Sequence, residues 1–342
     1  MTPPGWLAVC VTLLPYLYLT LVLVYGGLFY LARKKVFLGL LVALIVSAGV
    51  FWRNVLLPKS IQPASGIEAI RVMVWNVQRL GEFSQRTQVS QIDCVAQMIT
   101  QVRPDLLALL EITSHQLFAL QKRLNIPQNH CLWTDYYGTG QQKFGGLATC
   151  VANAAAEWNI YRKRQLHLPP NWKYLFIEVQ PPENISASPL NFLALHVAPP
   201  LVSKNEVWQI VKKLLRGKVE GFSLLRETLR TYEQQVELQG MQAVEALLHI
   251  RNFRDPTVIA GDFNSTRDAA LHGELRQTLI DTWSVAGMGF GATRYWGDVL
   301  PLRIDYIYTT KDFAVQQTQT PSASCSDHLP VVSSVFLYST TP

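Results

Sequence analysis

The chain divides into two parts that differ in their pattern of hydrophobic and polar residues. From Trp6 to Ala32 the sequence carries no charged residue, and a second uncharged run extends from Val36 to Trp52. The first run exceeds the ~20 residues that cross a bilayer as a helix, and the second approaches that length. We therefore predict two transmembrane helices, at about 6–32 and 36–52, within a membrane segment covering 1–57.

Residues 58–66 (PKSIQPASG) predict a linker, because Pro, Ser and Gly interrupt a continuing helix. From residue 67 to 342, short apolar runs alternate with amphipathic stretches. The predicted strands are Ile70–Trp75, Leu106–Leu110, Leu147–Val151, Tyr174–Val179, Leu190–Leu195, Thr257–Ala260, Ile304–Tyr308 and Val331–Leu337. Predicted helices cover Gln85–Val102, a segment after the N-cap candidate Thr113, and much of Lys204–Ile250.

This order of elements predicts one α/β domain. The strands are too many for one small sheet, and several are apolar on both sides. We expect a four-layer sandwich, in which two mixed β-sheets pack face to face and helices flank them on the outside.

The basic residues are unevenly distributed along the chain. Five of the 30 basic residues precede residue 60, which leaves 25 against 24 acidic residues, a net charge of +1, in the remainder. The pI near 9.0 therefore reflects the flanks of the apolar runs, and the domain lacks the broad positive surface of many nucleic-acid-binding proteins. A local cluster, Lys212, Lys213, Arg216 and Lys218, is interpreted as a solvated helix face, with a ligand-binding patch as the alternative.

The cluster Arg33-Lys34-Lys35 lies between the two uncharged runs, and short basic loops tend to remain in the cytoplasm. Both termini, and with them the domain, are then predicted to be extracytoplasmic, although Arg53 and Lys59 place positive charge on the opposite side. A signal peptide followed by a buried helix is the alternative. It lacks a positive region before the first run and a small-residue cleavage site.

The five cysteines form no CxxC or CxxH pattern, which argues against a zinc site. Cys10 lies in the first apolar run. We expect Cys94, Cys131, Cys150 and Cys325 to be unpaired thiols in the core, with a disulfide as the alternative if the domain faces an oxidising compartment.

Polar residues of chemical interest lie at the ends of the predicted strands, where side chains from several strands converge. They are Asn76, Glu111, His196, Asp262 and Asn264 of GDFNS, Asp305 of RIDYIY, and Asp327 and His328 of SDHLPV. Any one of them alone is more often a structural polar group or a cap. Together, carboxylate and amide oxygens suit a Mg²⁺-like ion, and the imidazoles suit proton transfer at a phosphate ester.

At these residues, in this order, the sequence resembles the endonuclease/exonuclease/phosphatase superfamily, over residues 70 to 337. GDFN, RIDYI and SDHLPV carry the resemblance in combination, and ALHVAPP is similar to the deoxyribonuclease branch. GFGAT before RIDYI looks like bacterial membrane-tethered members. The resemblance implies a phosphoric ester hydrolase that uses Mg²⁺, with Mn²⁺ as a substitute.

The same resemblance implies a role for each residue. Glu111 is expected to be the principal metal ligand, with Asn76 beside it and Asp327 assisting. Asp262 would orient or deprotonate the attacking water, while Asn264 would hold the phosphate. His328, oriented by Asp305, would stabilise charge on the phosphate, and His196 would donate to a phosphate oxygen or protonate the leaving group.

The sequence thus predicts a membrane-anchored phosphodiesterase, with a nuclease favoured because of ALHVAPP. A phospholipid (sphingomyelinase-like) or inositol phosphate phosphoesterase is the alternative. A non-catalytic membrane receptor or scaffold is disfavoured, because a chain released from catalysis would be expected to lose at least one of these residues.

Overall fold

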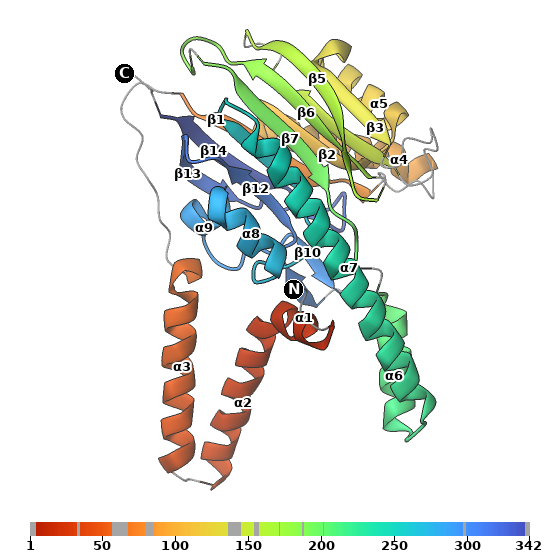
Figure 1. The fold of residues 1–342 in the computed structure, drawn as a ribbon, viewed down its shortest axis with the longest axis vertical. Helices are drawn as coiled ribbons and strands as arrows, with labels where there is room; N and C mark the ends of the chain where they lie inside the picture. The colour runs from red at the N-terminus through yellow and green to blue at the C-terminus, as the bar shows by residue number, and fades with distance from the viewer. Residues whose placement is uncertain are drawn as a thin grey trace.

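The structure is a computed structural model that describes residues 5–32, 35–56, 68–78, 85–135, 145–153, 157–170, 172–186, 188–200, 202–296 and 299–338. The predicted linker at 58–66 lies outside the described residues, as do Arg33 and Lys34. Two β-sheets and their covering helices form the body of the molecule, and the N-terminal helices and a helical arm extend from one end of it (Figure 1).

The first sheet has six strands in the order β13-β14-β1-β2-β4-β3. These are β1 (Ile70–Asn76), β2 (Leu106–Ile112), β3 (Cys131–Asp135), β4 (Gly146–Val151), β13 (Phe313–Gln319) and β14 (Val331–Leu337). Strands β1 and β2 run parallel, and the other neighbours run antiparallel, so the sheet is mixed.

The second sheet also has six strands, in the order β5-β6-β7-β8-β12-β9. These are β5 (Asn159–Leu168), β6 (Trp172–Gln180), β7 (Leu190–His196), β8 (Thr257–Asp262), β9 (Ile280–Asp281) and β12 (Asp305–Thr309). Only β7 and β8 are parallel among these pairs. A separate two-stranded ribbon joins β10 (Arg294–Trp296) to β11 (Leu300–Leu302).

Strand β1 is buried on both faces, and its side chains contribute to two hydrophobic cores. Ile70, Val72 and Val74 join the core between the sheets, whereas Met73 and Trp75 join the core on the outer face. The outer face is covered by α4 (Gln85–Val102) and α5 (Ser114–Leu124). Because successive side chains in a strand point to opposite faces, a strand buried on both sides must be apolar throughout.

The outer face of the second sheet is covered by α7 (Glu220–Arg251) and α8 (Ala270–Thr278), whose apolar side chains belong to the same core as the sheet. Two further helices are α6 (Lys204–Leu215) and α9 (Thr282–Ala286). The sandwich predicted from the sequence is therefore confirmed, with two mixed sheets flanked by helices.

All eight predicted strands are present, and both early helices form where they were predicted. Thr113 caps α5 in a capping box with Gln116. Strands β3, β5, β9, β10, β11 and β13 were missed. Strand β5 is largely exposed and polar, so its sequence lacks the apolar alternation that reveals a half-buried strand.

The prediction of unpaired thiols in the domain was wrong. Cys94 of α4 is bonded to Cys325, and Cys131 of β3 is bonded to Cys150 of β4. The first pair is 231 residues apart in sequence, so no spacing pattern could reveal it. The second joins directly opposed residues of an antiparallel pair, a relation that depends on the missed strand β3.

The N-terminal helices are α1 (Gly5–Thr12), α2 (Leu14–Ala32) and α3 (Lys35–Leu56). Pro15 falls in the first turn of α2, where its missing N–H breaks no helical hydrogen bond. Helix α1 packs on α7, and Thr12 Oγ1 lies 3.1 Å from the Tyr232 hydroxyl. Among the described residues, no helix combines the length and the hydropathy needed to cross a bilayer, so the two predicted spans remain predictions.

A buried ion pair secures the start of β12. Arg303 donates to both carboxylate oxygens of Asp281, at 2.6 and 3.3 Å, and stacks 4.4 Å over the ring of Tyr306. Burial raises the pKa of Asp281, but the charge of Arg303 and its hydrogen bonds outweigh that effect and lower it. Removal of one partner from such a buried pair costs about 3–5 kcal/mol, and Asp305 lies two residues beyond Arg303.

Candidate functional site

Three of the predicted site residues lie side by side on the second sheet. His196 ends β7, and in the parallel pairing it is the direct partner of Asp262 at the end of β8. Asp262 is in turn the direct partner of Asp305, the first residue of β12. Side chains at opposed positions of neighbouring strands point to the same face, so the sheet gathers these three groups in one row.

Asn76 approaches this row from the first sheet. It ends β1, and its side chain shares the inward face with Val72 and Val74. Its amide nitrogen donates to Glu111 Oε1 at 3.0 Å and to Asp262 Oδ2 at 3.1 Å. One amide group therefore joins the two sheets at the site and lies between two carboxylates.

Glu111 reaches the site because the backbone of β2 is irregular there. Leu110 faces the core between the sheets, so the next residue of a regular strand would point to the outer face. Instead the pairing of β2 with β4 shifts between Leu110 and Ile112, and Glu111 has a positive φ of 55°. Such a bulge re-aims a side chain.

Gly145 makes room for this bulge. Its φ is +70°, and a Cβ atom at this position would lie 2.9 Å from the backbone carbon of Glu111. Only glycine combines this backbone conformation with so close an approach. The sequence KFGGLATCV contains this requirement, although it gives no sign of which residue the glycine faces.

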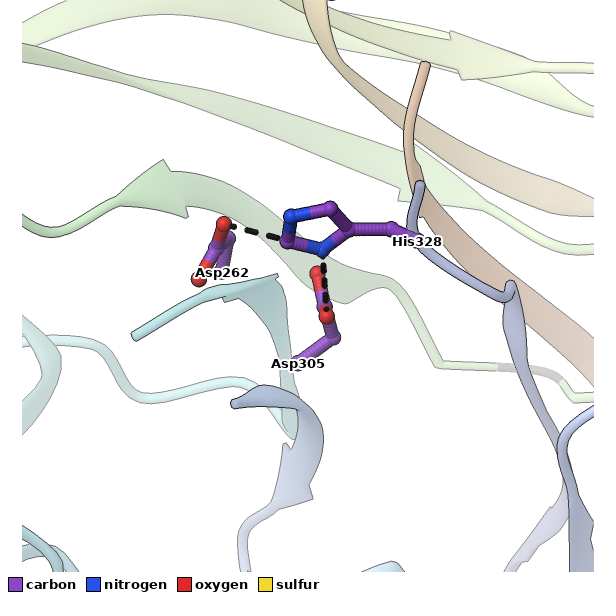
Figure 2. Close-up of side chains that lie close together, drawn as sticks. All are labelled: Asp262, Asp305 and His328. Atoms are coloured by element: carbon purple, nitrogen blue, oxygen red, sulfur yellow. Dashed lines mark hydrogen bonds and ion pairs between the residues drawn. The ribbon is translucent and has the colours of Figure 1, made fainter. Parts of the chain in front are cut away.

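His328 lies between the carboxylates of Asp262 and Asp305 (Figure 2). Its Nδ1 is 2.9 Å from Asp305 Oδ2 and 3.9 Å from Asp262 Oδ2. Burial lowers the pKa of His328, but the charge and hydrogen bond of Asp305, together with the charges of Asp262 and Asp327, raise it to about 9. The ring therefore carries a proton on each nitrogen at neutral pH, and the predicted pairing of Asp305 with His328 is present.

Asp262 is a buried carboxylate in a crowded electrostatic environment. Burial raises its pKa, as does the charge of Asp305, while His328 and His196 oppose this rise. Its Oδ1 accepts from the backbone N–H of Asn264 at 2.8 Å, and its Oδ2 lies 3.6 Å from His196 Nε2. A carboxylate whose pKa is raised is a stronger base than an ordinary aspartate.

The remaining predicted residues lie close by but make other contacts. The side chain of Asn264, whose φ is +49°, donates to the carbonyl of Val197 at 2.8 Å. Asp327 Oδ2 accepts from Arg294 at 3.0 Å, and its Oδ1 is 3.9 Å from His328 Nε2. These contacts join Asp327 to the histidine and to β10, so its predicted role as a metal ligand stays a prediction.

Sequence reasoning missed the residues that hold this site in place. Ser326 Oγ donates to the carbonyl of Asn76 at 2.7 Å and accepts from the N–H of His328 at 3.1 Å. Trp75 Nε1 donates to the carbonyl of His328 at 2.9 Å. Thr293 Oγ1 accepts from the N–H of Asp305 at 3.2 Å. The serine in SDHLPV and the threonine in GFGAT were the available signals.

The sequence profile of the endonuclease/exonuclease/phosphatase family matches residues 73–328, which include all eight predicted site residues. The chain belongs to the endonuclease/exonuclease/phosphatase family. Members of this family hydrolyse phosphoric esters. A search of curated proteins found no match to the sequence of this chain.

Solved structures share the fold of this family member. The human Nocturnin catalytic domain with a bound sulfate has 17% identity and a TM-score of 0.56, over 79% of this chain and 94% of that one. A Bacteroides thetaiotaomicron mannosyl-6-phosphatase has 14% identity and a TM-score of 0.56, over 78% and 100%. A family protein from Bacteroides vulgatus has 14% identity and a TM-score of 0.59, over 79% and 99%.

The donor groups of this family member fit a hard divalent cation. Within the described part of the chain, Asp262, Asp305 and His328 offer ligand atoms that lie within 4.8 Å of one another, and Asp305 Oδ1 is buried without a hydrogen-bond partner. A histidine must lose a ring proton to bind a metal, however, and the raised pKa of His328 opposes this loss. Carboxylate and amide oxygens at Glu111 and Asn76 are the better match.

The arrangement predicts that the charge of Asp305 keeps His328 protonated. Asp305→Asn should lower the pKa of His328 by about 1–3 pH units, the range for loss of one neighbouring opposite charge, whereas the exposed control Asp312→Asn should leave it unchanged. An NMR pH titration of the His328 ring measures both. An equal pKa in the wild type and in Asp305→Asn would contradict the assigned pairing.

Proposed function

We propose that the protein is a divalent-metal-dependent phosphodiesterase whose active site is the group of residues described above. The observation that carries the proposal is the amide of Asn76, which contacts both Glu111 and Asp262 and so joins a metal-binding side of the site to a catalytic side. Acidic oxygens that can hold a cation, a protonated imidazole and a second histidine within one site suit phosphate ester hydrolysis.

Glu111 and Asn76 would hold the cation, and Asp327 would assist if it exchanged its contact with Arg294. The cation, when bound, supplies positive charge that stabilises the phosphate oxygens. Asp262 holds and deprotonates the attacking water, because its raised pKa makes it a proton acceptor. Asn264 would orient the phosphate if its amide left the carbonyl of Val197.

His328 is the main positive group that this chain itself brings to the phosphate. Asp305 accepts from its Nδ1, which fixes the ring and leaves the Nε2–H to donate to a phosphate oxygen. His196 lies 3.6 Å from Asp262, and its ring makes a T-shaped contact with Trp172, with ring centroids 5.9 Å apart. We propose that it donates to a phosphate oxygen or protonates the leaving group.

We propose a nucleic acid as the substrate, because of the ALHVAPP sequence, which begins in β7 and contains His196. A phospholipid head group is the second candidate. It is favoured by a contact between the site region and the N-terminal helices, because the hydroxyl of Tyr16 in α2 donates to the carbonyl of Pro301 in β11. The ribbon formed by β10 and β11 also carries Arg294, the partner of Asp327.

We also propose that the N-terminal helices hold the protein at a bilayer and that its domain is extracytoplasmic. Exposed apolar side chains cover α2 and α3, including Leu23, Leu31 and Val36. The two disulfides support the proposed compartment, since disulfides persist in oxidising surroundings and are rare in the cytosol.

The metal assignment predicts the behaviour of Glu111→Gln, which removes a hard anionic ligand but preserves shape. At limiting Mg²⁺, its activity should fall by more than the ~100-fold typical for loss of an outer partner of a metal site, and excess Mg²⁺ or Mn²⁺ should restore part of it. The exposed control Glu183→Gln should match the wild type.

The assay uses the full chain with plasmid DNA, RNA, sphingomyelin and inositol phosphates. Hydrolysis of DNA or RNA supports the proposed substrate, and hydrolysis of sphingomyelin alone supports the second candidate. An unaltered Mg²⁺ requirement in Glu111→Gln would contradict the ligand assignment, and inactivity on every phosphate ester with added metal would contradict the proposed function.

The topology proposal predicts that protease added to intact cells or spheroplasts cleaves the domain, because the domain lies outside the cytoplasm. The measurement is an immunoblot against the C-terminal region, with a cytoplasmic protein as the control for intact membranes. Complete protection of the domain until the membrane is broken would reverse the assigned orientation.

A further inference from the structure

Helices α6 and α7 form an arm whose outer end carries exposed apolar side chains. Within this arm, Leu215 and Val219 are 82% and 81% exposed, and Phe222 is 66% exposed. We call this end the arm tip and define it by Trp208, Val211, Leu215, Val219 and Phe222, which are all exposed. Single exposed apolar residues are common, but five exposed large apolar side chains within residues 208–222 of one helical hairpin call for a function.

Basic residues alternate along the chain with the apolar residues of the arm tip. Lys212, Lys213, Arg216 and Lys218 lie in α6 and in the turn that follows it. Lys212 Nζ lies 5.3 Å above the ring of Trp208, and Lys213 is 3.4 Å from Glu220. Exposed apolar and aromatic side chains together with Lys and Arg are typical of a helix that lies at the surface of an anionic bilayer.

The direction of the arm agrees with this interpretation. The arm and the apolar helices α2 and α3 extend from the same end of the molecule, away from the two sheets (Figure 1). The arm contacts the first of the N-terminal helices, because α1 packs on α7 and Thr12 bonds to Tyr232. Two apolar surfaces that are distant in sequence thus face the same side.

Helix α7 also links the arm tip to the active site. Gln239, in the buried half of α7, donates to the carbonyl of Ala198 at 2.8 Å and to the carbonyl of Asn264 at 3.2 Å. From Glu220 to Gln239 the helix rises about 28 Å at ~1.5 Å per residue. A tip held at a surface would therefore hold the site at a fixed distance from that surface.

We propose that the arm tip binds the surface of an anionic phospholipid bilayer, as a second contact beside the N-terminal helices. Leu215, Val219 and Phe222 enter the boundary between head groups and acyl chains, while Arg216 and Lys218 contact lipid phosphates. The inference rests on the proposed membrane association, which the experiment below measures separately.

A nucleic acid is the less suitable partner for this surface. Bases stack on exposed aromatic rings, but the two most exposed residues of the tip, Leu215 and Val219, are aliphatic. These aliphatic side chains gain free energy on leaving water for a lipid surface, in proportion to the apolar area that is buried.

The test is hydrogen–deuterium exchange of the full chain, in vesicles of phosphatidylcholine alone and in vesicles with equal amounts of phosphatidylcholine and phosphatidylglycerol. Amide exchange in residues 204–222 should slow in the anionic vesicles. Arg216→Gln with Lys218→Gln should reduce this protection by about 25-fold, at roughly fivefold for each basic residue near an anionic surface. Leu215→Ser with Val219→Ser should abolish it.

The control is Lys122→Gln with Lys311→Gln, which changes the net charge equally at exposed positions on α5 and before β13. This variant should keep the full protection. Circular dichroism and exchange in the buried half of α7 establish that each variant is folded.

Three results would overturn the proposal. They are equal exchange of residues 204–222 in both kinds of vesicle, protection that rises with protein concentration in neutral vesicles, and protection by single-stranded DNA in neutral vesicles. Extraction of the chain from vesicles by alkaline carbonate would instead refute insertion of the N-terminal helices. The slowed amide exchange of residues 204–222 is measured before the extraction, so it tests the arm tip independently of the N-terminal helices.

Discussion

Two buried carboxylates, those of Asp262 and Asp305, lie opposite each other on neighbouring strands. Their negative charges repel each other, and the site depends on the groups that offset this repulsion. Their nearest ligand oxygens are within 4.8 Å, where two full charges repel by about 3.5 kcal/mol at an effective dielectric constant of ~20. The charge of Asp305 contributes to the raised pKa of Asp262, and the charges of both carboxylates contribute to the raised pKa of His328, which lies between the two. The histidine is held in its charged form by the same carboxylates that it stabilises.

The fold creates this arrangement through strand register and two local departures from regular structure. Register places His196, Asp262 and Asp305 in one row, and the amide of Asn76 closes the gap to the first sheet. The bulge at Glu111 turns its carboxylate toward the site, and Gly145 provides the space. Backbone irregularity at an active site is stabilised by its surroundings, here by the close packing of β2 on β4.

The strands and the candidate residues could be predicted from the sequence because both depend on local patterns. Apolar runs located β1, β2, β7, β8 and β14, and polar residues at their ends identified Asp262 and His328. The bulge at Glu111, the disulfide between Cys94 and Cys325 and the buried pair of Arg303 with Asp281 join distant segments, so no local pattern contains them. Strand β5 was not predicted, because its polar and exposed sequence resembles that of a loop.

The central claim is that Asp305 acts through His328, and a double-mutant cycle on the full chain tests it most directly. Hydrolysis is measured at saturating metal for the wild type, Asp305→Asn, His328→Ala and the double mutant, after circular dichroism has shown each to be folded. Residues that act as one unit give non-additive losses, so the double mutant should be scarcely slower than His328→Ala. Losses that multiply would contradict the account and assign Asp305 a separate role, such as direct metal binding.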